Sequence, residues 1–94
     1  MLDTMLTLSL VKTRLNRLPT DTSLDLYLMA RIDAVVKELE STGIHLTQEW
    51  DDTMLVVDMV VWQYQNRDTN AGMPEWLRLR RRERWVQEVH RHDP

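Results

Sequence analysis

The spacing of apolar residues is the feature that most constrains the fold of this chain. Leucine, isoleucine, valine and methionine recur every three or four positions along most of the 94 residues, which is the period of an α-helix that packs on one side. The two glycines and three prolines fall at the boundaries of these segments. The sequence therefore predicts an all-α protein that forms a single domain over residues 1–94.

The first two predicted helices have clear ends. The first covers about residues 4–17 and ends before Pro19, because the residue before a proline avoids helical backbone angles. The second ends at Gly43, which suits a left-handed turn, and Ile44 is expected to pack back on the helix. The candidate N-terminal caps of the second helix are Asp21, Thr22 and Ser23. The apolar face of the first helix consists of Leu8, Val11, Leu15 and Leu18, and that of the second consists of Leu24, Leu28, Ile32, Val35, Val36 and Leu39.

A connection over residues 44–51 follows the second helix. Its apolar members are Ile44, Leu46 and Trp50, which indicate a loop held against the body of the protein. Trp50 either covers the end of the bundle or lies in a contact between subunits, and the sequence favours neither.

The third predicted helix covers about residues 52–67, with Asp51 or Asp52 as its cap. Apolar side chains surround it on nearly all sides, including Trp62 and Tyr64, which are expected in the core. A helix of this kind is buried on most sides. We therefore expect it to be central in the fold, or to lie partly in a subunit interface.

The fourth predicted helix covers residues 74–90, and Pro74 suits its first turn. Its wheel is mixed, with apolar and charged side chains on both faces, so a simple core helix explains it poorly. The prediction is a small bundle of three packed helices plus a C-terminal Arg-rich helix that projects or docks. The residues expected to contact other proteins are Trp76, Arg78, Arg80, Arg81, Arg82, Arg84 and Trp85.

Charge and composition exclude several classes of function. Residues 1–70 carry 11 acidic and 6 basic side chains, whereas residues 71–94 carry 4 acidic and 6 basic ones. An acidic body with a basic end is unlike a general nucleic-acid binder. The chain has no cysteine, no glycine-rich phosphate loop and no catalytic arrangement, so we expect no enzyme and no cofactor. His90 and His92 lack a third ligand, so no metal site is expected, and no apolar run is long enough for a membrane span.

Three stretches resemble the head–tail connector (adaptor) proteins of tailed bacteriophages. Residues 7–15 resemble the opening helix of the family with its Val-Lys pair, and residues 23–43 resemble its long amphipathic helix ending in glycine. Residues 57–68 resemble its apolar helix, which closes in an aromatic residue, tyrosine, arginine and aspartate. The chain departs from the family pattern in its short loop between the second and third helices and in its heavier Arg-rich end.

The resemblance implies a structural role at the head–tail interface of the virion, with assembly in the host cytoplasm. The implied assembly is a ring of about a dozen copies around the DNA channel. Its implied partners are the portal protein on one side and a stopper or tail-completion protein on the other. DNA would pass through the channel without specific binding, and no membrane is involved.

The residues themselves leave three interpretations of the arginine cluster open. It is a solvated helix face, a docking surface for an acidic protein, or a binding site for nucleic-acid phosphates. Trp76 and Trp85 favour protein docking, because tryptophan and arginine are typical anchors of interfaces. The alternative function is a small helical DNA-binding or regulatory protein that uses the basic fourth helix.

Overall fold

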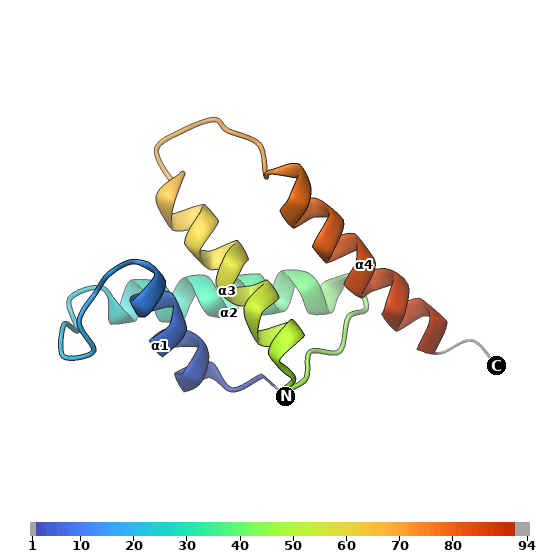
Figure 1. The fold of residues 1–94 in the computed structure, drawn as a ribbon, viewed down its shortest axis with the longest axis horizontal. Helices are drawn as coiled ribbons and strands as arrows, with labels where there is room; N and C mark the ends of the chain where they lie inside the picture. The colour runs from blue at the N-terminus through green and yellow to red at the C-terminus, as the bar shows by residue number, and fades with distance from the viewer. Residues whose placement is uncertain (1, 92–94) are drawn as a thin grey trace.

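A computed structural model describes residues 2–91, which form α-helices and no strands (Figure 1). The helices are α1 (Thr4–Arg14), α2 (Asp25–Ser41), α3 (Trp50–Gln65) and α4 (Glu75–Arg91). Helices α1, α2 and α3 all pack on one another, whereas α4 packs on α3. In Figure 1, α1 and α4 lie on opposite sides of α3, and α2 passes behind α1 and α3. The predicted bundle of three packed helices plus an Arg-rich C-terminal helix is confirmed.

Helix α3 is the centre of the core. Its residues 55–61 are all buried, which confirms the expectation of a helix enclosed on most sides. Each fully buried valine or leucine stabilises the fold by roughly 1.5–3 kcal/mol relative to an exposed one, so this helix contributes much of the apolar stabilisation. The other helices add Leu8, Val11, Leu28, Ile32, Val35, Leu39 and Leu77, and Trp62 and Tyr64 pack partly buried at the edge of the core.

Left-handed residues end both α1 and α2. Asn16 has φ of 58°, and the amide of Arg17 donates to the carbonyl of Lys12 at 2.8 Å, so α1 ends earlier than Pro19 would require. Gly43 has φ of 101°, and the amide of Ile44 donates to the carbonyl oxygen of Leu39 at 3.3 Å. Ile44 is buried, so the predicted end of α2 is confirmed.

The predicted start of α2 is wrong. Its N-cap residue is Leu24, which makes no side-chain capping bond. Asp21 instead accepts hydrogen bonds from the amide and hydroxyl of Ser23, at 3.0 and 2.7 Å, and forms a local turn. Short polar side chains stabilise such turns as readily as helix caps, so the sequence pattern did not distinguish the two.

Two of the apolar residues considered in the sequence, Leu18 and Trp50, lie in solvent. Leu18, expected on the inner face of the first helix, is 70 % exposed because α1 ends at Arg14 and the chain turns away. Trp50 is 62 % exposed and therefore does not cover the end of the bundle. Ile44 and Leu46 are buried as expected, so the connection is held against the body without Trp50.

Candidate protein-interaction surface

Helix α4 has one stripe that faces the body and another that faces solvent. Leu77, Arg84 and Glu88 are buried and recur at intervals of seven and four residues, which places them on the same side of the helix. Leu79 and Val89 are exposed on the other side. This arrangement explains the mixed helical wheel, because the buried stripe of α4 includes charged side chains.

Arg84 fastens α4 to the N-terminal end of α3. Its Nε donates to Oδ1 of Asp52 at 2.6 Å, and its Nη2 donates to the carbonyl of His45 at 2.8 Å. Glu88 lies one turn later on α4, with its carboxylate 3.2 Å from Arg84, and it accepts a hydrogen bond from the amide of His45 at 2.8 Å. The amide and hydroxyl of Thr47 donate to Asp52.

The environment of this network favours the ionised forms of its groups. The amide of His45 lowers the pKa of Glu88 to about 2, and Arg84 adds to this effect against the opposing effect of burial. Burial raises the pKa of Asp52, but the hydrogen bonds from Arg84 and Thr47 outweigh it, so this pKa lies below its ordinary value. The bond to Asp52 raises the pKa of Arg84. All three side chains are therefore charged at neutral pH.

Two expectations from the sequence are corrected by this network. Asp52 does not cap α3, because its carboxylate points to Arg84 and Thr47, and the N-cap residue is Glu49 without a side-chain bond. Arg84 does not belong to an exposed interaction surface, because it is buried against Asp52. Arg84 lies seven residues, or about two helical turns, after Leu77, and therefore on the same inward side of α4.

A second carboxylate, Asp58, holds two arginines at the surface of α3. Its side chain is nearly buried, with one oxygen 2.5 Å from Arg14 of α1 and the other paired with Arg80 of α4. Arg80 also lies over the ring of Trp76, 6.0 Å from its centroid. Asp58 was not predicted as a site residue. The available signal was a single carboxylate within an apolar, buried helix, which requires a cationic partner.

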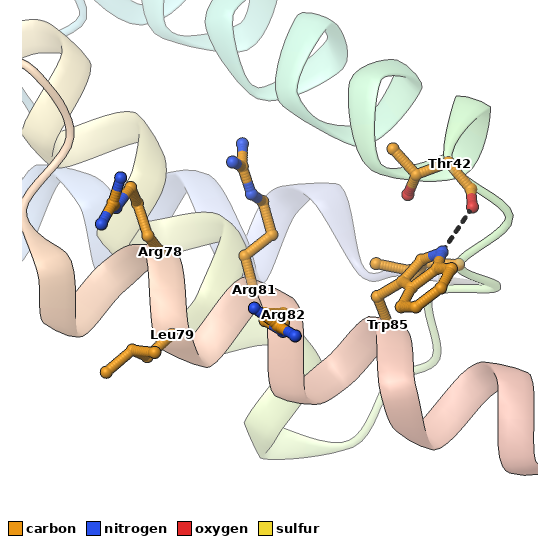
Figure 2. A pocket seen from close by; sticks show the side chains of 7 residues that line it. Thr42, Arg78, Leu79, Arg81, Arg82 and Trp85 are labelled. Carbon is orange, nitrogen blue, oxygen red and sulfur yellow. Dashed lines mark hydrogen bonds between the residues drawn. The ribbon is translucent and has the colours of Figure 1, made fainter.

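The α2–α4 groove lies between the C-terminal end of α2 and one side of α4 and has a volume of about 550 Å³ (Figure 2). The indole Nε1 of Trp85 donates to the carbonyl of Thr42 at 3.0 Å, so the ring is fixed as one wall. Arg78 and Arg81 extend from α4 toward α2 in Figure 2. The lining consists of Thr42, Ile44, Arg78, Leu79, Arg81, Arg82 and Trp85.

The arginines of the α2–α4 groove differ in how well they are neutralised. Arg81 lies 3.5 Å from Glu38 of α2, and both side chains are partly exposed, so this pair is weak. Arg78 and Arg82 form no ion pair with any residue between 2 and 91. The groove therefore combines apolar side chains with guanidinium groups that remain available to a partner.

The predicted interaction residues do not form one continuous surface. The α2–α4 groove brings together Arg78, Arg81, Arg82 and Trp85. Trp76 and Arg80 lie on the other flank of α4, near Asp58 of α3. Trp76 and Trp85 are 52 % and 43 % exposed, and both flanks thus present a tryptophan to solvent.

Neither a candidate metal cluster nor a membrane-spanning helix is found among residues 2–91. Between residues 2 and 91, no group of three or more histidine, aspartate and glutamate side chains is placed to hold a metal ion. His92, the second member of the histidine pair considered above, lies outside the described residues. No helix in this range is long and apolar enough to cross a membrane.

Comparison with known proteins gives no match. No family model, curated protein or solved structure is significantly similar to this chain.

Proposed function

We propose that this protein is a structural subunit of a phage head–tail connector ring, which joins the portal to the tail or stopper and surrounds the DNA channel. The observation that carries the proposal is the surface of α4. Exposed tryptophans and unpaired arginines lie on a helix whose other side is fastened to a small all-α body. The resemblance of residues 7–15, 23–43 and 57–68 to the connector family supplies the kind of assembly.

Exposed tryptophans support assembly with other proteins. Trp50, Trp76 and Trp85 are each between 43 % and 62 % exposed, although tryptophan is a side chain that proteins bury in cores and interfaces. Tryptophan together with arginine is enriched among the residues that dominate binding energies. Three such residues on one small chain favour several contacts with neighbouring subunits, as a ring requires.

The structure favours protein docking over DNA binding for the arginine cluster. Arg80 and Arg84 are paired with Asp58 and Asp52, so their charges are largely neutralised within the chain. Arg78 and Arg82 remain without an ion pair among residues 2–91, and Arg81 has only a weak pair with Glu38. Three guanidinium groups provide a small electrostatic footprint for a phosphate backbone. A channel subunit that lets DNA pass needs such weak attraction.

The partners in this proposal are other copies of the chain, the portal and a stopper or tail-completion protein. The test is to mix the purified protein with the portal ring encoded in the same genome and to image the particles by electron microscopy. We expect a ring of density added to one end of the portal. A portal ring that stays bare at excess subunit concentration would contradict the proposal, and a portal ring mixed with an unrelated helical protein is the control.

A further inference from the structure

We propose that Trp50 and its acidic neighbours insert into the α2–α4 groove of a second copy, so that identical subunits join head to tail. The inference rests on the self-assembly in the proposed function and specifies the two surfaces that meet. One surface is the acidic knob, defined here as Glu49, Trp50 and Asp51 at the start of α3. The other is the α2–α4 groove.

The side chains of the acidic knob are exposed to solvent. Trp50 is 62 % exposed and takes no part in the core, although it is the first residue of the most buried helix. Glu49 and Asp51 are exposed on either side of it and form no ion pair with any residue between 2 and 91. An exposed indole between two unpaired carboxylates combines apolar area with negative charge.

The α2–α4 groove has the complementary properties. Its volume of about 550 Å³ lies within the range of natural binding pockets, roughly 300–1,000 Å³. Ile44 and Leu79 supply apolar lining, and Trp85 is held in place by its bond to Thr42. The groove therefore needs little reorganisation before an aromatic side chain enters.

The unpaired charges of the two surfaces are equal in number and opposite in sign. Arg78 and Arg82 of the groove have no ion pair within the described residues, and neither do Glu49 and Asp51 of the acidic knob. Each guanidinium can bind one carboxylate with two parallel hydrogen bonds. The charges thereby fix the orientation in which the indole enters.

The knob and the groove lie on opposite flanks of α4, so one molecule cannot fill its own groove. Asp51 lines a small cavity together with Leu55 of α3 and with Arg80, Glu83, Arg84 and Gln87, and the α4 members lie on one flank of that helix. The groove residues Arg78 and Trp85 lie on the other flank, by the geometry of the helix. Because the two surfaces differ and point apart, each added copy presents a new groove, and such a contact closes into a ring when its rotation allows.

The test uses two variants of the full chain that each lack one surface. Trp50→Ala removes the indole of the knob and keeps the groove. The double variant Arg78→Glu, Arg82→Glu reverses the two unpaired charges of the groove and keeps the knob. We expect either variant alone to self-associate at least about 30-fold more weakly than the wild type, as for a central interface tryptophan. A mixture of the two should form a heterodimer and grow no further, because it contains one intact contact.

The measurement is native mass spectrometry with analytical ultracentrifugation up to about 1 mM, where weak contacts are populated. Leu26→Ala is the matched control, because Leu26 is an exposed apolar residue of α2 away from both surfaces. Circular dichroism checks the fold of each variant, and Trp50→Gln is a second version of the knob variant that keeps a helix-forming side chain.

The outcomes separate this inference from the proposed function. Wild-type oligomers that persist unchanged in Trp50→Ala, or a mixture that stays monomeric, would overturn the inference and leave the connector role intact. If the wild type assembles only on the portal ring, the numbers of wild-type and Trp50→Ala subunits bound to the portal are compared. Equal numbers would overturn the inference. A wild type that is monomeric both alone and with the portal would overturn both.

Discussion

Arg82 and Arg84 are neighbours in sequence but have different physical roles. Arg84 is buried and shared between Asp52 and Glu88, whereas Arg82 faces the groove without an ion pair in the described chain. The loss in free energy of unfolding when an arginine is replaced depends on whether that arginine is buried with a partner or solvated. A buried carboxylate that loses its cation is left uncompensated, while a solvated arginine is replaced by water.

Substitution of Arg84 by alanine should lower the free energy of unfolding by roughly 3 kcal/mol, because Asp52 loses its buried partner. The matched variant Arg78→Ala should change it by less than about 0.5 kcal/mol. Urea denaturation of both variants measures the difference. Equal effects would show that Arg84 does not anchor α4.

Substitution of Val60 by aspartate should lower the free energy of unfolding by about 4 kcal/mol or more, because the new charge is buried without a partner. Val89→Asp is the control, since Val89 is exposed on α4 and the same change there meets water. Thermal unfolding followed by circular dichroism compares the two. A Val60→Asp variant that melts with the wild type would contradict the buried position of α3.

At the scale of elements, the predictable features were those encoded by local chemistry. The periodicity identified every helix in residues 2–91, and Gly43 with Ile44 marked the end of α2. The start of α3 was missed because an aspartate at position 52 can either cap the helix or form an ion pair. The ion pair forms with Arg84, which lies 32 positions later in the sequence. The buried stripe of α4 was missed for the same reason, since a charged residue is placed inward only when its partner is known.

The attachment of α4 should weaken in acid. The pKa of Glu88 is about 2 in the folded protein against an ordinary value of 4.5, so its ionised form stabilises the fold above pH 4.5. That stabilisation is lost as the pH falls toward 2, and the lowered pKa of Asp52 acts in the same direction. We expect amides of α4 to lose hydrogen-exchange protection before those of α3 as the pH is lowered through this window.

The matched variant for this prediction is Glu88→Gln, which removes the titrating group and keeps the size of the side chain. Its α4 protection should depend less on pH between 4.5 and 2 than that of the wild type. Hydrogen exchange with mass spectrometry measures both proteins. Identical pH profiles for α4 would contradict a stabilising role for ionised Glu88.

At the scale of the whole molecule, charge is separated between an acidic body and a basic end. The basic end is weaker than its sequence indicates, because the arginines directed toward α3 are matched by its carboxylates. Of the groove arginines, Arg78 and Arg82 remain without an ion pair among residues 2–91, and Arg81 is only weakly paired. This residual charge is suited to guiding a partner into place more than to holding a nucleic acid.

Duplex DNA should therefore bind weakly and with little dependence on salt. Arg78 and Arg82, with the weakly paired Arg81, give a slope of the logarithm of affinity against the logarithm of salt concentration no steeper than about −3. Fluorescence anisotropy of a labelled duplex at several salt concentrations measures it, with Arg78→Glu, Arg82→Glu as the comparison. A slope of about −5 or steeper would favour the DNA-binding alternative.

Fastening α4 largely through buried charges also determines how its attachment responds to temperature. The hydration of charged groups becomes less favourable on warming, so the penalty for burying Arg84, Asp52 and Glu88 falls as the temperature rises. The apolar contacts of the three-helix body gain nothing comparable at high temperature. Relative to that body, α4 should consequently be held more firmly in warm solution than in cold.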